Sequence, residues 1–499
     1  MASSVDHHHK LHFVLFPLMQ QGHMIPMIDM ARLFAERNII VTIVTTPANS
    51  LRFKKVVDRS VESGLCIRLL ILPFPSANTG LPEGCENIDA LPSPEWAFKF
   101  LKATTSLQES FEKSFLDLEP VPSCIISDMA FPWTAEIADK LKIPRISFYG
   151  TSCFYQLCSH NILQSKILES TASLSDPFIV PGLPDQIKVT KAILPRTLYP
   201  TSDDLIDFCD QIRKAELTAY GVVVNSFQEL ETVYEEEYQQ AKFGKVWCVG
   251  PVSLCNREIL DKAERGNKTI IDENQCLKWL DSRDPGSVVY ACFGSLCALT
   301  SSEMIELALG LEASKCPFVW KVGYWLHKEE FEERNKDRGL VIKGWAPQVL
   351  ILSHRSIGGF LTHCGWNSVM EGVCAGVLLI AWPTGAEQFF NEKLIVQVLG
   401  IGVKVGADDI LASDTKLVHK EKVLGSAKNK GDVEKAVKKL MEEGKEGEER
   451  RRKVRDFGKK ANRAMEEGGS SHNNLTLLIQ NIMQYQANMG LPCQVQKTA

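Results

Sequence analysis

The feature that most constrains this fold is an alternation of short apolar runs with helical patterns, which the chain repeats in two series. Short continuous apolar runs are typical of parallel strands buried on both faces, and helical connections between them build a doubly wound sheet. In the N-terminal half the apolar runs are 11–16, 38–46, 123–127, 144–150 and 221–227. Helical spacing predicts helices at 24–37 and 135–142, with 17–26 as the loop after the first strand.

A second series begins near residue 287 and predicts a second parallel sheet. Its predicted strands are 287–295, 317–322, 359–364 and 377–382, with helices at 301–314, from about Trp366, and from near Ala386. At roughly 150 residues per domain, 499 residues fit two large domains. We therefore expect an α/β protein in which two Rossmann-like parallel-sheet domains face each other across a cleft, with ligands at the carboxyl ends of the strands.

The expected domain limits follow from changes in composition. Residues 1–250 form the N-terminal domain, and 250–275, rich in charge with Pro and Gly, form the interdomain connection. The second domain is 251–470, in which the charged stretch 442–472 indicates a solvated helix face. Residues 471–499 are interpreted as an amphipathic helix that packs back on the N-terminal domain, followed by a tail.

Charge and cysteine usage exclude several classes of function. The net charge of −5 and the pI near 6.2 provide no basic field for nucleic acid or an anionic membrane. Fifteen scattered cysteines without a CxxC pattern indicate reduced thiols in a cytoplasmic protein. The apolar stretch 11–19 is too short to cross a membrane, and we recognise no secretory signal.

The densest polar motif is "HCGWNS", residues 363–368, where a predicted strand ends and a helix starts. Gly365 allows a sharp turn, while Asn367 and Ser368 lie in the first helical turn, whose free N–H groups favour phosphate. His363 can add a hydrogen-bond donor or a positive charge. The alternative is a capped helix beside an ordinary core histidine, and these six residues alone leave both interpretations open.

A second pair of polar residues follows two strands of the first domain. His23 and Asp128 each come after a predicted strand, and parallel-sheet geometry can bring two such ends together. The residues alone favour a structural role for Asp128, such as a helix N-cap.

Residues 345–388, "WAPQVLILSHRSIGGFLTHCGWNSVMEGVCAGVLLIAWPTGAEQ", closely resemble the plant secondary product glycosyltransferase box. This box marks the plant family-1 UDP-sugar-dependent glycosyltransferases, and the segments "FPLMQQGHMIPMIDMARLFA", "VNSFQELE" and "CLKWLDS" resemble the same family. The run from Gly359 to Leu394 is similar to the flavonoid, terpenoid and hormone glucosyltransferase branch. The resemblance implies the GT-B fold and a hexosyltransferase of class EC 2.4.1.

The resemblance also implies a role for each residue of a donor site. Trp345 would stack on uracil, Ala346 and Gln348 would read its polar edge, and Glu371 would accept the ribose hydroxyls. Ser295, His363, Asn367, Ser368 and the helix N-terminus would hold the diphosphate. Glu387 and Gln388 would bind sugar hydroxyls, with Trp366 beside them.

For the reaction, the resemblance makes His23 the general base and Asp128 its orienting partner. A single displacement would transfer glucose from UDP-glucose to a hydroxyl of a small lipophilic plant metabolite (a triterpenoid, flavonoid or hormone) and give a β-O-glucoside. We expect no metal and no cofactor beyond this donor, a monomer, and no nucleic-acid partner. The acceptor pocket would be lined around residues 74–84 and 148–158.

Departures from the family pattern keep another function in view. Leu378 stands where proline is usual, and Thr384-Gly385 replaces bulkier residues before Glu387. The stretches 321–334 and 406–431 also match poorly. A non-catalytic or weakened UDP-sugar binder is therefore the alternative. A nucleotide-dependent oxidoreductase is disfavoured because the first strand-to-helix turn has no GxGxxG pattern.

Overall fold

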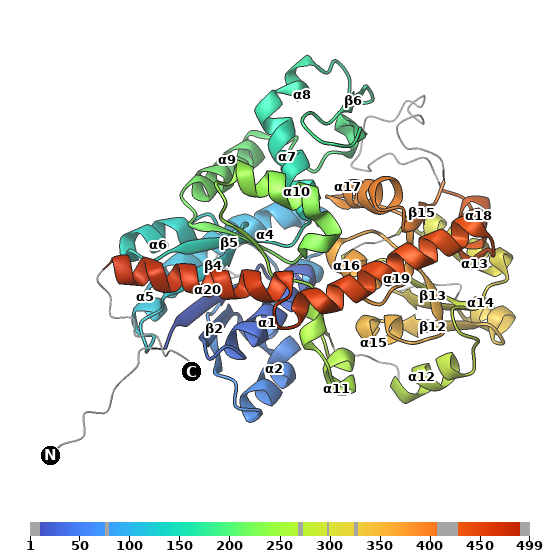
Figure 1. The fold of residues 1–499 in the computed structure, drawn as a ribbon, viewed down its shortest axis with the longest axis horizontal. Coiled ribbons are helices and arrows are strands. Elements are labelled where there is room, and N and C mark those ends of the chain that lie inside the picture. The colour runs from blue at the N-terminus through green and yellow to red at the C-terminus, as the bar shows by residue number, and fades with distance from the viewer. Residues whose placement is uncertain are drawn as a thin grey trace.

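A computed structural model describes residues 10–74, 79–267, 273–296, 299–323, 328–406 and 428–489. Two parallel sheets lie side by side, the first from the blue-to-green part of the chain and the second from the yellow-to-orange part (Figure 1). The predicted α/β class with two parallel-sheet domains is confirmed.

The first sheet has the strand order β3-β2-β1-β4-β5-β8-β9 and is parallel throughout. Its strands are β1 (His12–Phe16), β2 (Ile40–Thr45), β3 (Ile67–Ile71), β4 (Cys124–Asp128), β5 (Arg145–Tyr149), β8 (Gly221–Val224) and β9 (Val246–Cys248). Its helices are α1 (Gln21–Ala35), α2 (Pro47–Glu62), α4 (Ala97–Ala103), α5 (Gln108–Leu116), α6 (Thr134–Leu141), α7 (Cys153–Ser165), α8 (Ile167–Ser170), α9 (Asp203–Leu217) and α10 (Gln228–Ala241). A small antiparallel pair, β6 (Pro177–Ile179) and β7 (Lys188–Thr190), lies outside this sheet. The register pairs Phe16 with Ser127, so the ends of β1 and β4 are neighbours.

The second sheet has the strand order β12-β11-β10-β13-β14-β15 and is also parallel. Its strands are β10 (Val288–Cys292), β11 (Phe318–Val322), β12 (Gly339–Lys343), β13 (Ile357–Thr362), β14 (Leu378–Ala381) and β15 (Gly402–Lys404). Its helices are α12 (Glu273–Asp281), α13 (Ser301–Ser314), α14 (Lys328–Asn335), α15 (Gln348–Leu352), α16 (Trp366–Cys374), α17 (Gln388–Lys393) and α18 (Lys430–Met441). Cys292 pairs with Thr362, which sets the turns after β10 and β13 side by side.

The two C-terminal helices together contact both domains. Helix α19 (Lys445–Met465) packs on α16 and α10, and α20 (Ser470–Asn488) packs on β9 (Figure 1). Leu475, Leu478 and Ile482 of α20 belong to the same buried cluster as Phe13 of β1. The charged stretch predicted as a solvated face also has a buried stripe, because Val454 and Ala461 of α19 are fully buried. Most of the poorly matching stretch 406–431 lies outside the described residues, as do 324–327.

Helix α1 begins earlier than predicted, which changes the position of His23. The expected loop over 17–26 is wrong in its second half, because the helix starts at Gln21 and His23 lies in its first turn. Pro26 favours a loop in the sequence, but inside the helix it removes a single hydrogen bond, the one to the Gly22 carbonyl. That oxygen instead accepts a hydrogen bond of 2.6 Å from Nδ2 of Asn367 in the second domain.

The connection between the domains is packed against the first domain. It contains the short helix α11 (Ile259–Ala263), and Asp261 of this helix forms ion pairs with Arg32 of α1 and Arg59 of α2. Arg265 follows α11 and points into the space between the domains. Part of the charge that marked this segment as a connection in the sequence therefore holds it against the first domain through partly buried ion pairs.

The described residues also show the state of the cysteines and the character of the helices. Every described cysteine is a free thiol, and most are buried. None of the described helices combines the length and the apolar character needed to span a bilayer.

Candidate active site

A cavity of about 520 Å³ lies where the carboxyl ends of the two sheets face each other. All the residues predicted to hold the donor line it, together with His23, whereas Asp128 lies behind His23. The donor residues are Ser295, Trp345, Ala346, Gln348, His363, Trp366, Asn367, Ser368, Glu371, Glu387 and Gln388. Gly150 and Thr151 come from the predicted acceptor segment 148–158, but no described residue of 74–84 lines this cavity.

His23 and Asp128 form a directly hydrogen-bonded pair. Nδ1 of His23 lies 2.5 Å from Oδ2 of Asp128, and the other carboxylate oxygen accepts the backbone N–H of Ala130 at 3.0 Å. Asp128 is fully buried at the end of β4, while the His23 side chain is 23% exposed. The N-cap alternative for Asp128 is wrong, because α6 starts only at Thr134. The carboxylate fixes the tautomer with hydrogen on Nδ1, which leaves the Nε2 lone pair free to act as a base.

The pKa of His23 is set by opposing effects. Burial lowers it, but the charge of Asp128 and its hydrogen bond raise it, with a further increase from Glu387, so the pKa ends above the ordinary 6.5. The pKa of Glu387 is itself raised, chiefly because burial disfavours the carboxylate. His23 is therefore a stronger base than a free histidine, and a carboxyl group of the second domain lies near it.

The HCGWNS turn leaves a helix N-terminus open to the cavity. Helix α16 has Gly365 as its N-cap, and no side chain caps it. The capped-helix interpretation is therefore wrong, and the N–H groups of the first turn remain for a ligand. Gly365 is required by close packing, because a Cβ at this position would lie 2.4 Å from Nε2 of His363. Gly294 packs against the His363 ring from the other side, where a Cβ would lie 2.7 Å from the nearest ring atom.

His363 contributes hydrogen bonding rather than charge. Burial, together with the nearby charge of Lys321, lowers the pKa of His363 to about 4. The imidazole is therefore neutral at pH 7, and the positive charge considered from the sequence is not available. Ser295 lies in the turn after β10, at the neighbouring strand end. The turn after β10 and the start of α16 thus offer a neutral set of hydrogen-bonding groups.

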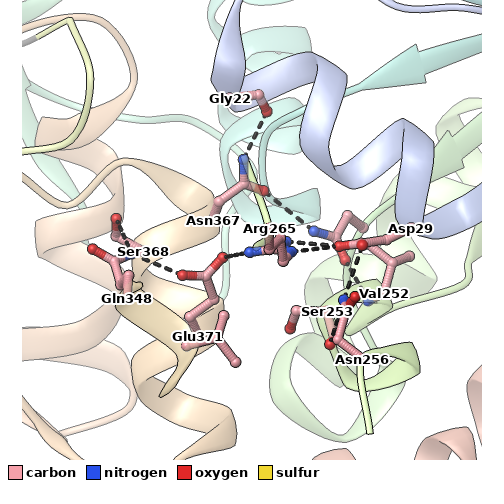
Figure 2. A network of polar contacts seen from close by, with 12 residues as sticks. Gly22, Asp29, Val252, Ser253, Asn256, Arg265, Gln348, Asn367, Ser368 and Glu371 are labelled. Carbon is pink, nitrogen blue, oxygen red and sulfur yellow. Dashed lines mark hydrogen bonds and ion pairs between the residues drawn. The ribbon is translucent and has the colours of Figure 1, made fainter. Parts of the chain in front are cut away.

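At the expected nucleoside end, the Glu371 carboxylate accepts hydrogen bonds from two side chains. Arg265 donates to Oε1 of Glu371, and Gln348 donates to Oε2 at 2.8 Å (Figure 2). Gln348 also reaches Ser368, with 3.2 Å between Nε2 and Oγ. Trp345 donates through its indole N–H to the carbonyl oxygen of Arg265 at 3.3 Å. One hydrogen-bonded surface therefore includes the Trp345 ring, the Gln348 amide and the Glu371 carboxylate.

Asn367 and Trp366 form contacts between the domains. Nδ2 of Asn367 donates to Gly22, and its Oδ1 accepts from Asn225 at 3.3 Å. The indole N–H of Trp366 donates to the backbone oxygen of Asn225 at 2.8 Å. Both ends of the Asn367 amide are thus occupied by the first domain, whereas the sequence motif predicts only a diphosphate contact.

At the expected sugar end, Gln388 stabilises its own turn. Its Oε1 accepts hydrogen bonds from the backbone N–H groups of Thr384 at 2.8 Å and Gly385 at 3.1 Å. A Cβ on Gly385 would meet no atom within 4 Å. Gln388 therefore stabilises the turn that contains Gly385. Gly385 instead leaves open space in the cavity wall.

Sequence reasoning missed the three cations that line the cavity among the described residues, Lys262, Arg265 and Lys321. Arg265 stands in a charged segment without periodicity, so no local signal separated it from solvated charges. Lys321 carried a signal, because it is a lysine near the end of an apolar strand. Among the described residues, no group of three or more His, Cys, Asp or Glu side chains is arranged to hold a metal ion.

Comparison with known proteins gives close relatives over nearly the whole chain. Residues 274–433 match the family model described as UDP-glucoronosyl and UDP-glucosyl transferase. UDP-glycosyltransferase 73C25 of Barbarea vulgaris is 50% identical over 495 residues, covering 97% of this chain and 99% of that protein. UDP-glycosyltransferase 73C3 of Arabidopsis thaliana is 50% identical over 496 residues with the same coverage.

Solved structures share the arrangement of both domains. Glycyrrhiza uralensis UGT73P12, complexed with glycyrrhetinic acid 3-O-monoglucuronide, matches with a TM-score of 0.86 and 36% identity over 96% of this chain and 97% of that chain. Arabidopsis thaliana UGT89C1 complexed with UDP matches with a TM-score of 0.70 and 30% identity, covering 95% of this chain and 100% of that chain.

Proposed function

Because the chain belongs to the plant UDP-glycosyltransferases, we propose that it transfers glucose from UDP-glucose to a hydroxyl of a small lipophilic plant metabolite, with inversion. The family, the GT-B fold and the enzyme class expected from the sequence are confirmed. One observation carries the finer proposal. A hydrogen-bonded His23–Asp128 pair and the uncapped N-terminus of α16 reach the same cavity from opposite domains.

The nucleotide is proposed to lie along the second domain. Trp345 stacks on uracil, the backbone of Ala346 and the side chain of Gln348 bind its edge, and Glu371 accepts the ribose hydroxyls. The diphosphate lies at the start of α16, where Asn367 and Ser368 are in the first turn and where Ser295 and His363 add hydrogen bonds. Because His363 is neutral, it can donate a hydrogen bond to the diphosphate without first gaining or losing a proton.

The proton transfer is proposed to occur at Nε2 of His23. An acceptor hydroxyl is almost entirely un-ionised at pH 7, so the base removes its proton as the oxygen attacks the anomeric carbon. The new bond is C–O to the acceptor, and the bond that breaks joins the anomeric carbon to the diphosphate. Asp128 stabilises the imidazolium that forms. The leaving diphosphate takes the bonding electron pair, and the helix N-terminus stabilises its charge.

The donor sugar is proposed to be glucose, held by Glu387 and Gln388 with Trp366 beside them. These side chains line the cavity between His23 and the start of α16. Phytolacca americana UGT2, which is 26% identical, was solved with UDP-2fluoro-glucose and pterostilbene. UGT89C1 was solved with UDP-L-rhamnose, so the choice of sugar varies among the relatives and needs a direct test.

The acceptor is proposed to be a triterpenoid, flavonoid or plant hormone. UGT73P12 was solved with glycyrrhetinic acid 3-O-monoglucuronide and UGT89C1 with quercetin. We propose that the reaction needs no added metal, because the uncapped start of α16 offers backbone N–H groups to the leaving diphosphate. The alternative of a weakened binder rests on Leu378 and Gly385, but Leu378 is buried in β14 and pairs with Gly359.

The experiment combines the purified protein with UDP-glucose and a mixed panel of triterpenoid, flavonoid, steroid and cytokinin acceptors, with EDTA present. Mass spectrometry should find a product heavier by one hexose, and the identity of that product names the acceptor class. Tight UDP binding without product from any acceptor would favour the non-catalytic alternative. Product that forms only after a divalent metal replaces EDTA would overturn the metal-free proposal.

A further inference from the structure

Arg265 occupies a position between the two domains that its sequence context does not suggest. Its guanidinium donates to Oδ2 of Asp29 through Nε at 2.8 Å and through Nη2 at 2.7 Å, and it donates to Glu371 through Nη1. The Arg265 side chain is 9% exposed, and the two carboxylates are 2% and 6% exposed. Figure 2 shows Arg265 between Glu371 and Asp29, and Asn256 also donates to Asp29.

The two carboxylates belong to the two helices that carry the site. Asp29 lies on α1, six residues after His23, and Glu371 lies on α16, four residues after Asn367. At 1.5 Å per residue, Asp29 lies roughly 9 Å along α1 from His23, and Glu371 lies roughly 6 Å along α16 from Asn367. The guanidinium therefore joins the helix of the proposed base to the helix of the proposed diphosphate site. A buried arginine fork suits this task, because it can bond two carboxylates in fixed geometry.

Arg265 does not use up the acceptor capacity of Glu371. A carboxylate offers about four lone-pair directions, and Arg265 and Gln348 each take one. Two directions remain for two ribose hydroxyls. The arginine also holds the carboxylate in a fixed orientation through its hydrogen bond to Oε1.

We propose that Arg265 is a positioning residue of the transfer reaction: it orients Glu371 toward the donor ribose and fixes α16 relative to α1, so that the sugar is held in line with His23. This inference rests on the proposed function, since it assumes that Glu371 binds the ribose and that His23 is the base. It differs from an inhibitory role, in which Arg265 would block Glu371 until the nucleotide displaced it. The two roles predict changes of opposite sign in UDP affinity.

The test compares Arg265→Met with Arg265→Lys and with a matched control, Arg59→Met. Arg59 binds Asp261 and Glu264 of the same connection but touches neither α16 nor the cavity. Arg265→Met should weaken UDP binding about 10-fold and lower kcat on the order of 100-fold, because misplacement by about 1 Å is that costly. Arg265→Lys should recover part of the UDP affinity, and Arg59→Met should keep both values.

A second variant separates the two contacts and guards against a folding defect. Asp29→Asn leaves the Arg265–Glu371 pair intact, so UDP affinity should stay near wild type while kcat falls. Unchanged kcat in both Arg265→Met and Asp29→Asn would overturn the inference, as would tighter UDP binding by Arg265→Met. Failure of the proposed function is a separate result, because the wild-type protein itself would then form no glycoside.

An independent observation concerns Lys321. It lies near the carboxyl end of β11, next to β10, and its Nζ donates to the carbonyl oxygen of Gly294 at 3.0 Å. Lys321 lines the cavity together with Ser295 and His363. Its charge is one of the two causes that keep His363 neutral.

The other cations of the cavity wall are placed differently. Among the described residues these are Lys262 and Arg265, both from the connection, and Arg265 is paired with two carboxylates. A nucleoside diphosphate carries at least two negative charges, and His363 offers none in return. The geometry points to Lys321 as the cation that binds the diphosphate of the donor, from the turn after β10.

The test for Lys321 uses UDP and uridine as paired probes, with Lys343→Met as the control. Lys343 ends the next strand, β12, and does not line the cavity. Lys321→Met should weaken UDP binding about 10-fold, reduce its dependence on salt, and leave uridine affinity unchanged. Unchanged UDP affinity, or an equal loss for uridine and UDP, would remove this assignment. A wild-type protein that binds uridine and UDP equally would instead contradict the proposed diphosphate site.

Discussion

Helices α1 and α16 begin alike and present different groups to the cavity. Each follows the carboxyl end of a parallel strand, and neither has a side-chain cap. In α16 the cap is Gly365, whose missing side chain leaves room for His363 and exposes backbone N–H groups. In α1 the first turn carries His23, which is paired with Asp128. One helix start is therefore suited to bind an anion, and the other to present a base.

In the proposed reaction, inversion follows from placing these two helix starts on opposite sides of one cavity. The proposed base lies in the first domain, and the proposed leaving group departs toward the second. The Asn367–Gly22 hydrogen bond and the Arg265 bridge set the spacing between them. If this division holds, changes in α1 affect catalysis, whereas changes in α16 affect nucleotide binding.

The largest effect is expected from His23→Ala. Removal of the base should lower kcat by about 10²–10⁴-fold, while UDP affinity stays near wild type because no proposed nucleotide contact is lost. Glycoside formation and UDP titration on the same preparation check both parts. Turnover at the wild-type rate would remove the base assignment.

Glu371→Ala should give the reverse pattern. Loss of the carboxylate that accepts the ribose hydroxyls should weaken UDP binding about 10- to 100-fold. Arg265 also loses a partner, so thermal unfolding is measured in parallel to separate stability from binding. An unchanged UDP dissociation constant would mean that the ribose contact is misplaced.

Gly365→Ala tests whether the start of α16 needs its missing side chain. The added Cβ would overlap His363, and overpacking of this kind costs about 1–3 kcal/mol. UDP affinity should fall accordingly, with the fold retained by circular dichroism. Wild-type affinity would show that the turn can move aside.

The pH dependence tests the His23–Asp128 pair. The base must be neutral, and its pKa lies above 6.5, so log kcat/KM should fall as the pH drops through that raised value. In Asp128→Asn the two largest effects that raise the pKa of His23 are lost, only the smaller effect of Glu387 remains, and burial lowers the pKa, so the acid limb should move to lower pH. An acid limb that stays in place would separate Asp128 from the titration.

The smallest effect is expected from Gly385→Ala, which serves as the control for Gly365→Ala. Both glycines line the cavity, but a Cβ on Gly385 meets no atom within 4 Å. Stability should change by less than about 0.5 kcal/mol, and UDP affinity should be retained. A loss as large as that of Gly365→Ala would show that the turn before Glu387 depends on glycine itself.

The sequence predicted the elements whose signal is local. Apolar runs such as 11–16 and 287–295 became buried strands, and the residues of the HCGWNS turn line the cavity with the other predicted donor residues. The start of α1 was missed because Pro26 signals a loop, although its lost hydrogen bond is replaced by one from Asn367. A residue pattern cannot show a partner that lies 345 positions away.

The unpredicted features arise where the domains meet. The charge of His363 depends on burial and on Lys321, and neither can be inferred from six adjacent residues. Arg265 looks like a solvated charge until the fold places Asp29 and Glu371 on either side of it. These properties belong to the packed cavity, and they appear only when both sheets are in place.

The configuration of the product at the anomeric carbon is the most direct test of a single displacement between α1 and α16. The glucoside formed from UDP-glucose would be isolated and its anomeric proton coupling measured by nuclear magnetic resonance. A base on α1 and a leaving group at α16, on opposite faces of the sugar, predict a β-glucoside from the α-linked donor. An α-glucoside would contradict a single displacement between these two helices.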